Sequence, residues 1–143
     1  MNFKKQRPGV RPGEIADVED RFELALPEDL KRIYTQTNGG TLEDFLYEYG
    51  DISTVISQIL PLSSDSGMSA ARSYHLFVED RGIVPRHFFP FAVDGGGDYF
   101  FVDCRTAEGR VHLFRADDDP PEQLQDLGVG IAGFGARLRP EGA

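Results

Sequence analysis

The sequence predicts an α+β fold in which a mostly antiparallel sheet is backed by helices. The N-terminal third carries apolar residues at helical spacing, interrupted by proline and glycine signals for helix ends. Residues 85–114 instead contain three aromatic and β-branched runs separated by short glycine-containing connections, which is typical of consecutive antiparallel strands. We expect a β-meander in the C-terminal half, two N-terminal helices, a middle helix and a short C-terminal helix.

Length, composition and charge limit the function. A chain of 143 residues, 40% of them hydrophobic, is most simply one domain with a substantial core. No apolar run is long enough for a membrane span, and no apolar segment follows the first lysines as in a secretory signal, so we expect a cytoplasmic protein. The formal net charge of −9 argues against nucleic acid as a partner; it suits a basic protein partner, and it equally suits solubility alone.

The first 23 residues predict a loose arm followed by a helix. Residues 1–11 contain cations, a proline and a glycine without periodicity, so we expect a flexible arm before a single domain over residues 12–143. A helix over residues 12–23 is predicted by an apolar stripe at helical spacing, formed by Ile15, Val18 and Phe22.

A second helix is predicted to start at Pro27, because proline fits a first helical turn. Its acidic residues come early and its basic residues late, which is the favourable polarity relative to the helix dipole. Asn38, Gly39 and Gly40 accept the left-handed conformation of a helix C-terminus, so we expect them to end this helix.

Residues 41–80 carry less regular patterns. Every second residue from 45 to 49 is aromatic, as in a strand, whereas residues 52–62 fit either a strand or a helix. Residues 66–80 favour a helix that is capped by Ser66.

Side-chain alternation assigns the two faces of the meander. Successive residues of a strand point to opposite sides, so Phe100 and Phe101 lie on different faces. The first run, residues 88–93, is apolar on both sides and should be an interior strand with cover above and below. One face of the last run, with His112 and Phe114, is expected to be half wet.

The glycines between Asp94 and Asp98 have two explanations. Three glycines permit the positive φ angles of a tight reversal, and bare backbone N–H groups can also cradle an anion. A phosphate loop would need a lysine, a serine or threonine and a following helix, and the two aspartates would repel an anion. We therefore favour the turn.

Two patterns near the C-terminus match those of ligand sites. Asp117, Asp118 and Asp119 suggest a metal, but a hard cation needs further converging oxygens, so a solvated helix entry is favoured. Residues 128–133 match the glycine pattern of dinucleotide-binding loops, but no strand is predicted before them and no βαβ unit can follow. We expect a short closing helix there, and neither a cofactor nor a metal.

No residue set indicates an enzyme. His75, His87 and His112 are scattered over the predicted elements without the spacing of a zinc site. Cys104 excludes an intramolecular disulfide and is interpreted as an inert apolar filler. Aspartates around the meander could pair as in glycoside hydrolysis, but ordinary turn aspartates are far commoner, so we expect binding rather than catalysis.

An ordered combination of local motifs resembles the SUKH superfamily over about residues 12–138. It consists of a helix with a glutamate, a Leu-Pro step, a helix with an aromatic, an Asn-Gly-Gly end and, later, a Gly-Asp pair before a strand. The matching residues are Glu19, Leu26, Pro27, Tyr34, Asn38, Gly39, Gly40, Gly97, Asp98, Asp103 and Gly109. The resemblance implies structural roles for these signature residues.

The resemblance also implies a binding function. Bacterial members are often immunity proteins that neutralise a toxin, such as a nuclease, and an acidic surface would attract a basic toxin and occlude its active site. Candidate contacts are Glu43, Asp44, Tyr47, Glu48, Asp51, Asp94, Asp98 and Tyr99. The alternative is an intracellular scaffold or regulatory protein-interaction module of the same fold, and the oligomeric state is left open.

Overall fold

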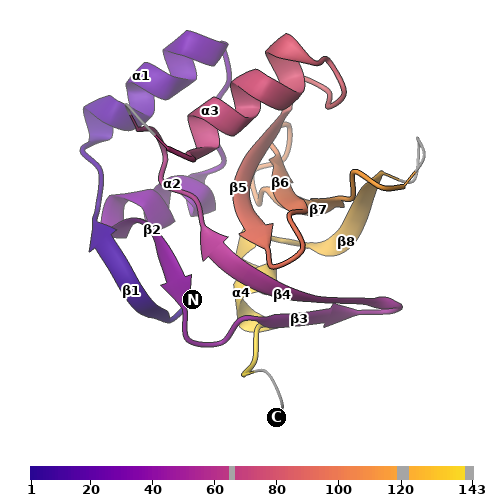
Figure 1. Ribbon diagram of the computed structural model, residues 1–143. Coiled ribbons are helices and arrows are strands. Elements are labelled where there is room, and N and C mark those ends of the chain that lie inside the picture. The colour runs from indigo at the N-terminus through magenta and orange to yellow at the C-terminus, as the bar shows by residue number, and fades with distance from the viewer. Residues whose placement is uncertain (65–66, 119–122, 141–143) are drawn as a thin grey trace.

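The computed structural model describes residues 1–64, 67–118 and 123–140 and confirms the α+β fold (Figure 1). Within these ranges an antiparallel sheet has the strand order β1-β2-β4-β5-β6-β7-β8, and β3 pairs with the first half of β4. The strands are β1 (Phe3–Pro8), β2 (Thr37–Leu42), β3 (Leu46–Tyr49), β4 (Ile52–Ile59), β5 (Phe88–Asp94), β6 (Tyr99–Asp103), β7 (Arg110–Phe114) and β8 (Leu124–Gly130). The helices are α1 (Pro12–Phe22), α2 (Glu28–Gln36), α3 (Ala70–Tyr74), its π-helical continuation η1 (His75–Asp80) and α4 (Ile131–Ala136).

The predicted meander is formed by β5, β6 and β7, and it is covered on both faces. Phe100 and Phe101 are neighbours in β6, yet neither has exposed surface. Phe100 joins a large hydrophobic cluster with the four α-helices, and Phe101 joins a smaller cluster with Phe77 of η1. Phe114 is buried in the smaller cluster, so of the two residues expected on a half-wet face only His112 is partly exposed.

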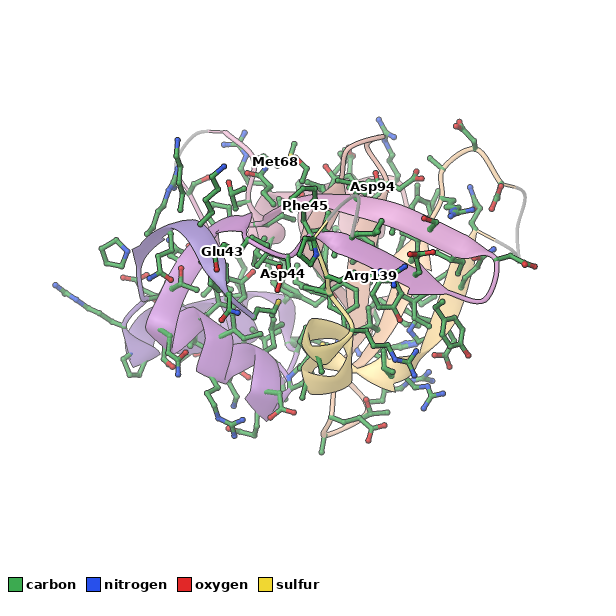
Figure 2. All side chains as sticks on the ribbon, turned by 90° about the horizontal axis from the view of Figure 1, so that it is seen from below. Glu43, Asp44, Phe45, Met68, Asp94 and Arg139 are labelled. Atoms are coloured by element: carbon green, nitrogen blue, oxygen red, sulfur yellow. The ribbon has the colours of Figure 1, made fainter. Side chains whose placement is uncertain are left out.

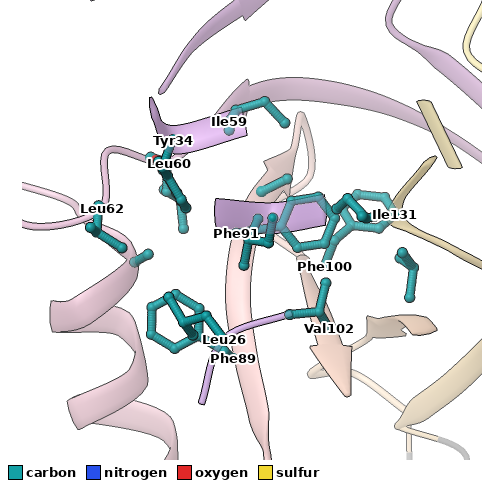
Figure 3. Close-up of a cluster of buried hydrophobic side chains, with 14 of the residues drawn as sticks. Leu26, Tyr34, Ile59, Leu60, Leu62, Phe89, Phe91, Phe100, Val102 and Ile131 are labelled. Carbon is teal, nitrogen blue, oxygen red and sulfur yellow. The ribbon is translucent and has the colours of Figure 1, made fainter. Parts of the chain in front are cut away.

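The large cluster joins both ends of the chain to the sheet. Figure 3 shows Phe91 and Phe100 of the meander packed with Ile131 at the start of α4. The ring of Phe134 in α4 lies with its centroid 4.8 to 5.7 Å from three rings on three different strands, those of Tyr47, Phe91 and Phe100. Each buried aromatic side chain contributes about 1.5–3 kcal/mol relative to exposure, so α4 is an integral part of the core.

The structure differs from the expected flexible arm, because residues 3–8 form the edge strand β1. This strand pairs antiparallel with β2, and Gln6 lies opposite Gly40. The Thr37 hydroxyl donates a further hydrogen bond to the Arg7 carbonyl at 3.1 Å. Five of the six β1 residues are exposed, so backbone pairing rather than burial holds the strand, and the sequence shows no apolar periodicity.

Asn38, Gly39 and Gly40 lie in strand β2, so the prediction that they end helix α2 was wrong. A Cβ on Gly39 would lie 2.6 Å from the Ile59 carbonyl oxygen, and one on Gly40 would lie 2.0 Å from the Lys5 carbonyl oxygen. The glycines are therefore needed where β2 passes close to the backbones of β4 and β1.

The middle of the chain contains a strand and then a helix. Residues 52–59 form β4, which settles the ambiguity of that segment. The cap of α3 is Ser69, whose hydroxyl accepts a hydrogen bond from the Arg72 N–H at 3.1 Å. Ser66, the expected cap, lies outside the described residues.

A strand does precede the glycine pattern of residues 128–133, contrary to expectation. However, β8 pairs antiparallel with β7, and α4 has only six residues, so no βαβ unit forms. A Cβ on Gly130 would lie 2.8 Å from the Glu108 carbonyl oxygen, which gives this glycine a packing role. No helix in the described part of the chain is long and apolar enough to cross a membrane.

Replacing Gly109 by alanine is expected to destabilise the fold. Gly109 has a φ of +65°, and a Cβ there would lie 3.0 Å from the Pro27 Cβ, so alanine adds backbone strain to a forced contact. We expect the free energy of unfolding, measured by urea denaturation, to fall by about 1–3 kcal/mol. Gly13→Ala is the matched control, because a Cβ there meets no atom within 4 Å and alanine favours helix α1. Equal effects of the two substitutions would contradict a packing role for Gly109.

Candidate partner-binding surface

Several signature residues join the helices to the sheet. The Glu19 carboxylate accepts a hydrogen bond from the Leu26 N–H at 2.7 Å and lies 3.8 Å from the Lys31 ammonium, which fixes the connection between α1 and α2. Pro27 in the same connection lies against Gly109 before β7. These contacts maintain the fold.

Two further signature residues anchor the segment that follows β4. The Tyr34 hydroxyl donates a hydrogen bond to the Leu60 carbonyl at 2.8 Å, and the Asn38 Oδ1 accepts one from the Leu62 N–H at 2.8 Å. Burial raises the pKa of Tyr34, so its hydroxyl stays protonated and able to donate.

Asp103 is buried at the end of β6, and Arg105 balances its charge. The Arg105 Nε and Nη2 atoms donate hydrogen bonds to the carboxylate at 3.1 and 3.0 Å, and the Arg105 backbone N–H donates another at 2.9 Å. Burial alone would raise the pKa of Asp103, but these hydrogen bonds outweigh it and lower the pKa. Asp103 therefore serves as an ionised structural residue.

Three predicted contact residues on or before the β3–β4 hairpin present carboxylates to solvent. Glu43 and Asp51 are exposed, and Asp44 is partly exposed. None of the three forms an ion pair with another residue that the structure describes. We refer to Glu43, Asp44 and Asp51 as the acidic set.

Two other predicted hairpin contacts have internal partners. Tyr47 has no exposed surface, and its ring stacks on that of Phe134 at 4.8 Å between centroids, so it is a core residue. Glu48 is exposed but forms an ion pair with Arg139, which also bonds through its backbone to Leu46 of β3. These contacts fix the hairpin against the C-terminal segment.

Asp94 organises the glycine turn from within. Its Oδ1 accepts hydrogen bonds from the N–H groups of Gly96 and Asp98 at 2.9 and 2.8 Å, and its Oδ2 accepts one from the Thr54 hydroxyl at 2.8 Å. The Gly96 and Asp98 N–H groups, which an anion cradle would offer, are thus bonded to Asp94, which supports the turn interpretation.

Asp98 and Tyr99 are both partly exposed beside this turn. Burial, and then the Asp94 carboxylate, raise the pKa of Asp98, against a hydrogen bond from the Ala116 N–H. The Tyr99 ring packs edge-on against Phe77, with 4.8 Å between centroids. The outer parts of both side chains remain accessible to a partner.

Strand β4 brings the hairpin and the glycine turn together. Val55 pairs with Leu46 of β3 on one side and accepts a hydrogen bond from the Gly95 N–H at 2.9 Å on the other. Figure 2 shows Asp44 near the start of the β3–β4 hairpin and Asp94 farther along it, with the hairpin tip extending beyond both. Contact residues predicted from two distant segments therefore lie on neighbouring parts of one sheet.

Sequence reasoning missed two exposed apolar side chains near this surface. Tyr49 is 39% exposed and its ring lies under the Arg137 guanidinium at 5.3 Å, while Met68 is 50% exposed with its sulfur 3.9 Å from the Tyr99 hydroxyl. The position of Tyr49 next to a glycine turn signalled exposure, whereas Met68 lies in a segment without periodicity.

The remaining reactive groups occupy structural positions. Within the described ranges, no group of three or more His, Cys, Asp and Glu residues could hold a metal ion. Burial raises the pKa of Cys104 to about 12, so its thiol is protonated near neutral pH. The rings of His87 and His112 pack against Phe88 at 4.4 and 4.7 Å between centroids.

Asp98→Asn is expected to stabilise the protein at neutral pH. Folding raises the pKa of Asp98 above its ordinary value of 3.8, so the folded protein disfavours the ionised carboxylate. The resulting loss of stability is complete at pH values above the pKa in the folded protein and absent at pH values below the pKa in the unfolded chain. The melting temperature of the variant should exceed that of the parent at about pH 7, and the difference should shrink toward about pH 3. Asp51→Asn, at the exposed hairpin tip, is the control and should change the melting temperature little. Identical melting of parent and Asp98→Asn at neutral pH would refute the burial cost.

Comparison with family models matches residues 9–127 to the SMI1 / KNR4 family (SUKH-1). The match spans most of the chain and includes every signature residue and every predicted contact residue. Comparison with curated proteins found no match. The family match confirms the resemblance seen in the sequence, and the chain belongs to the SMI1 / KNR4 family (SUKH-1).

Proposed function

We propose that this protein is an immunity protein that binds a toxin protein and occludes its active site. Membership of the SUKH-1 family supports a binding function, because bacterial proteins of the superfamily are often immunity proteins. The main observation behind the proposal is that this family member carries the acidic set. The carboxylates of the acidic set make no ion pair within the described residues. Such carboxylates favour a basic partner.

Charged and apolar side chains contribute differently to binding of the toxin. The acidic set attracts a basic toxin over roughly one Debye length, about 8–10 Å at physiological salt, and so speeds the encounter. The exposed parts of Tyr49 and Met68 then supply apolar contact area, which slows dissociation.

The hairpin is held in place before any partner arrives. The stacking of Tyr47 on Phe134 fixes its inner face, and the Leu46 and Arg139 backbones exchange hydrogen bonds at 2.8 and 3.0 Å. A preorganised surface loses little conformational entropy on binding, which suits a protein that blocks an active site by fitting over it.

The first experiment is growth rescue. Genes beside the gene for this protein are expressed one at a time in a bacterium, with and without this protein. A neighbour that arrests growth alone, is harmless together with this protein and copurifies with it would support the proposal. A toxin that stays active while bound would contradict occlusion, and the absence of any toxic neighbour would favour a scaffold or regulatory role.

Neutralising the acidic set is expected to slow association with that toxin by about tenfold at low salt, with a smaller effect on dissociation. The variant is Glu43→Gln/Asp44→Asn/Asp51→Asn, and the association rate is measured by stopped-flow fluorescence between about 25 and 300 mM salt. The parent rate should fall steeply with salt, and the variant rate should fall less.

The matched control changes the net charge equally on exposed carboxylates of helix α1, as Glu14→Gln/Asp17→Asn/Asp20→Asn. This control should associate nearly as fast as the parent protein. Equal slowing of the two variants would show that net charge, and not the hairpin surface, directs the encounter.

A further inference from the structure

Positive charge is concentrated at one edge of this acidic protein. Residues 1–11 carry four cations and no acidic residue, whereas the rest of the chain carries all 24 acidic residues. Three of these cations, Lys4, Lys5 and Arg7, lie in β1 and are exposed. They form no ion pair with another residue in the described ranges, so their charge is available at the surface.

Strand β1 also has a free edge. It is the terminal strand of the sheet and pairs with β2 on one side, and no described strand pairs with its other side (Figure 1). The outward backbone N–H and C=O groups of such a strand are a template for a further strand. Pro8 has no N–H, so the template ends there.

A groove of about 200 Å³ extends from β1 over its inner neighbours β2 and β4. Its lining includes Lys5 and Arg7 of β1, Thr41 of β2 and Gln58 of β4, and no carboxylate is present among the described lining residues. A side chain that entered this groove would meet cationic and uncharged polar groups, which complement a carboxylate.

We propose that β1 binds an extended acidic polypeptide segment as an additional strand of the sheet. Lysines on an edge strand disfavour pairing between two copies of this chain, because like charges would lie opposite each other. A strand with carboxylates at alternate positions is attracted to these cations instead of repelled. Its backbone also forms hydrogen bonds with the free N–H and C=O groups of β1. Three cations on a protein of net charge −9 are too few for stable binding of nucleic acid. Glu43 of the acidic set adjoins only the N-terminal end of β1, where its N–H donates a hydrogen bond to the Asn2 carbonyl at 2.8 Å. The proposed strand addition does not depend on the proposed function.

The test uses the 143-residue protein labelled with ¹⁵N and a six-residue peptide of alternating glutamate and valine with blocked ends. We expect saturable changes in the amide spectrum that are centred on β1 and β2. The same peptide with every backbone nitrogen methylated should bind at least about tenfold more weakly, because it cannot donate ladder hydrogen bonds.

Charge variants locate the site. Lys5→Glu should weaken binding at least about threefold, whereas Arg11→Glu, the same change of charge beyond the end of β1, should stay within about twofold of the parent. If Lys5→Glu is unfolded by circular dichroism, Lys4→Glu takes its place. If the methylated peptide bound as tightly as the unmethylated one, binding would rest on charge attraction that any polyanion shows. That result would overturn strand addition. Absence of saturable binding, or changes centred on the β3–β4 hairpin, would also overturn it.

Discussion

Burial of β6 on both faces is the constraint on which the rest of this fold depends. Phe100 and Phe101 are adjacent and point to opposite sides, so each side of the strand needs its own apolar cover. The α-helices supply the cover for Phe100, while η1 supplies it for Phe101 through Phe77, whose ring centroid lies 5.9 Å from that of Phe101. The π-helical extension of α3 thus has a clear role, because it brings Phe77 onto the second face.

Apart from Asp98, which is in both sets, the family signature and the candidate contact residues lie at different positions of the chain. Glu19 bonds to the backbone of the α1–α2 connection, and Tyr34 and Asn38 bond to the backbone that follows β4, so a change at any of them would disturb the fold. The side chains of Glu43 and Asp51 are exposed and make no ion pair among the described residues. One scaffold can therefore carry different surface residues without a change to the contacts that hold the fold.

Local sequence patterns predicted the helices and strands whose buried apolar residues recur at a regular spacing. The helical stripe before Phe22 and the alternation around Phe100 are examples of such patterns, and the structure has the corresponding elements. Strand β1 could not be found this way, because its pairing leaves no apolar pattern. The glycines at 39 and 40 suit a helix end and a close backbone approach equally, and only contacts distant in sequence decide between them.

The candidate surface shows the same limit. Tyr47 and Tyr49 have the same spacing and chemistry, yet only Tyr47 is buried, because Phe134 reaches it from the other end of the chain. Since α4 and Arg139 follow the hairpin in the chain, the hairpin emerges from the ribosome before its stacking partner and its ion-pair partner. Nascent chains and shortened translation products therefore lack the fixed hairpin. Formation of the fixed hairpin therefore requires synthesis to continue through Arg139.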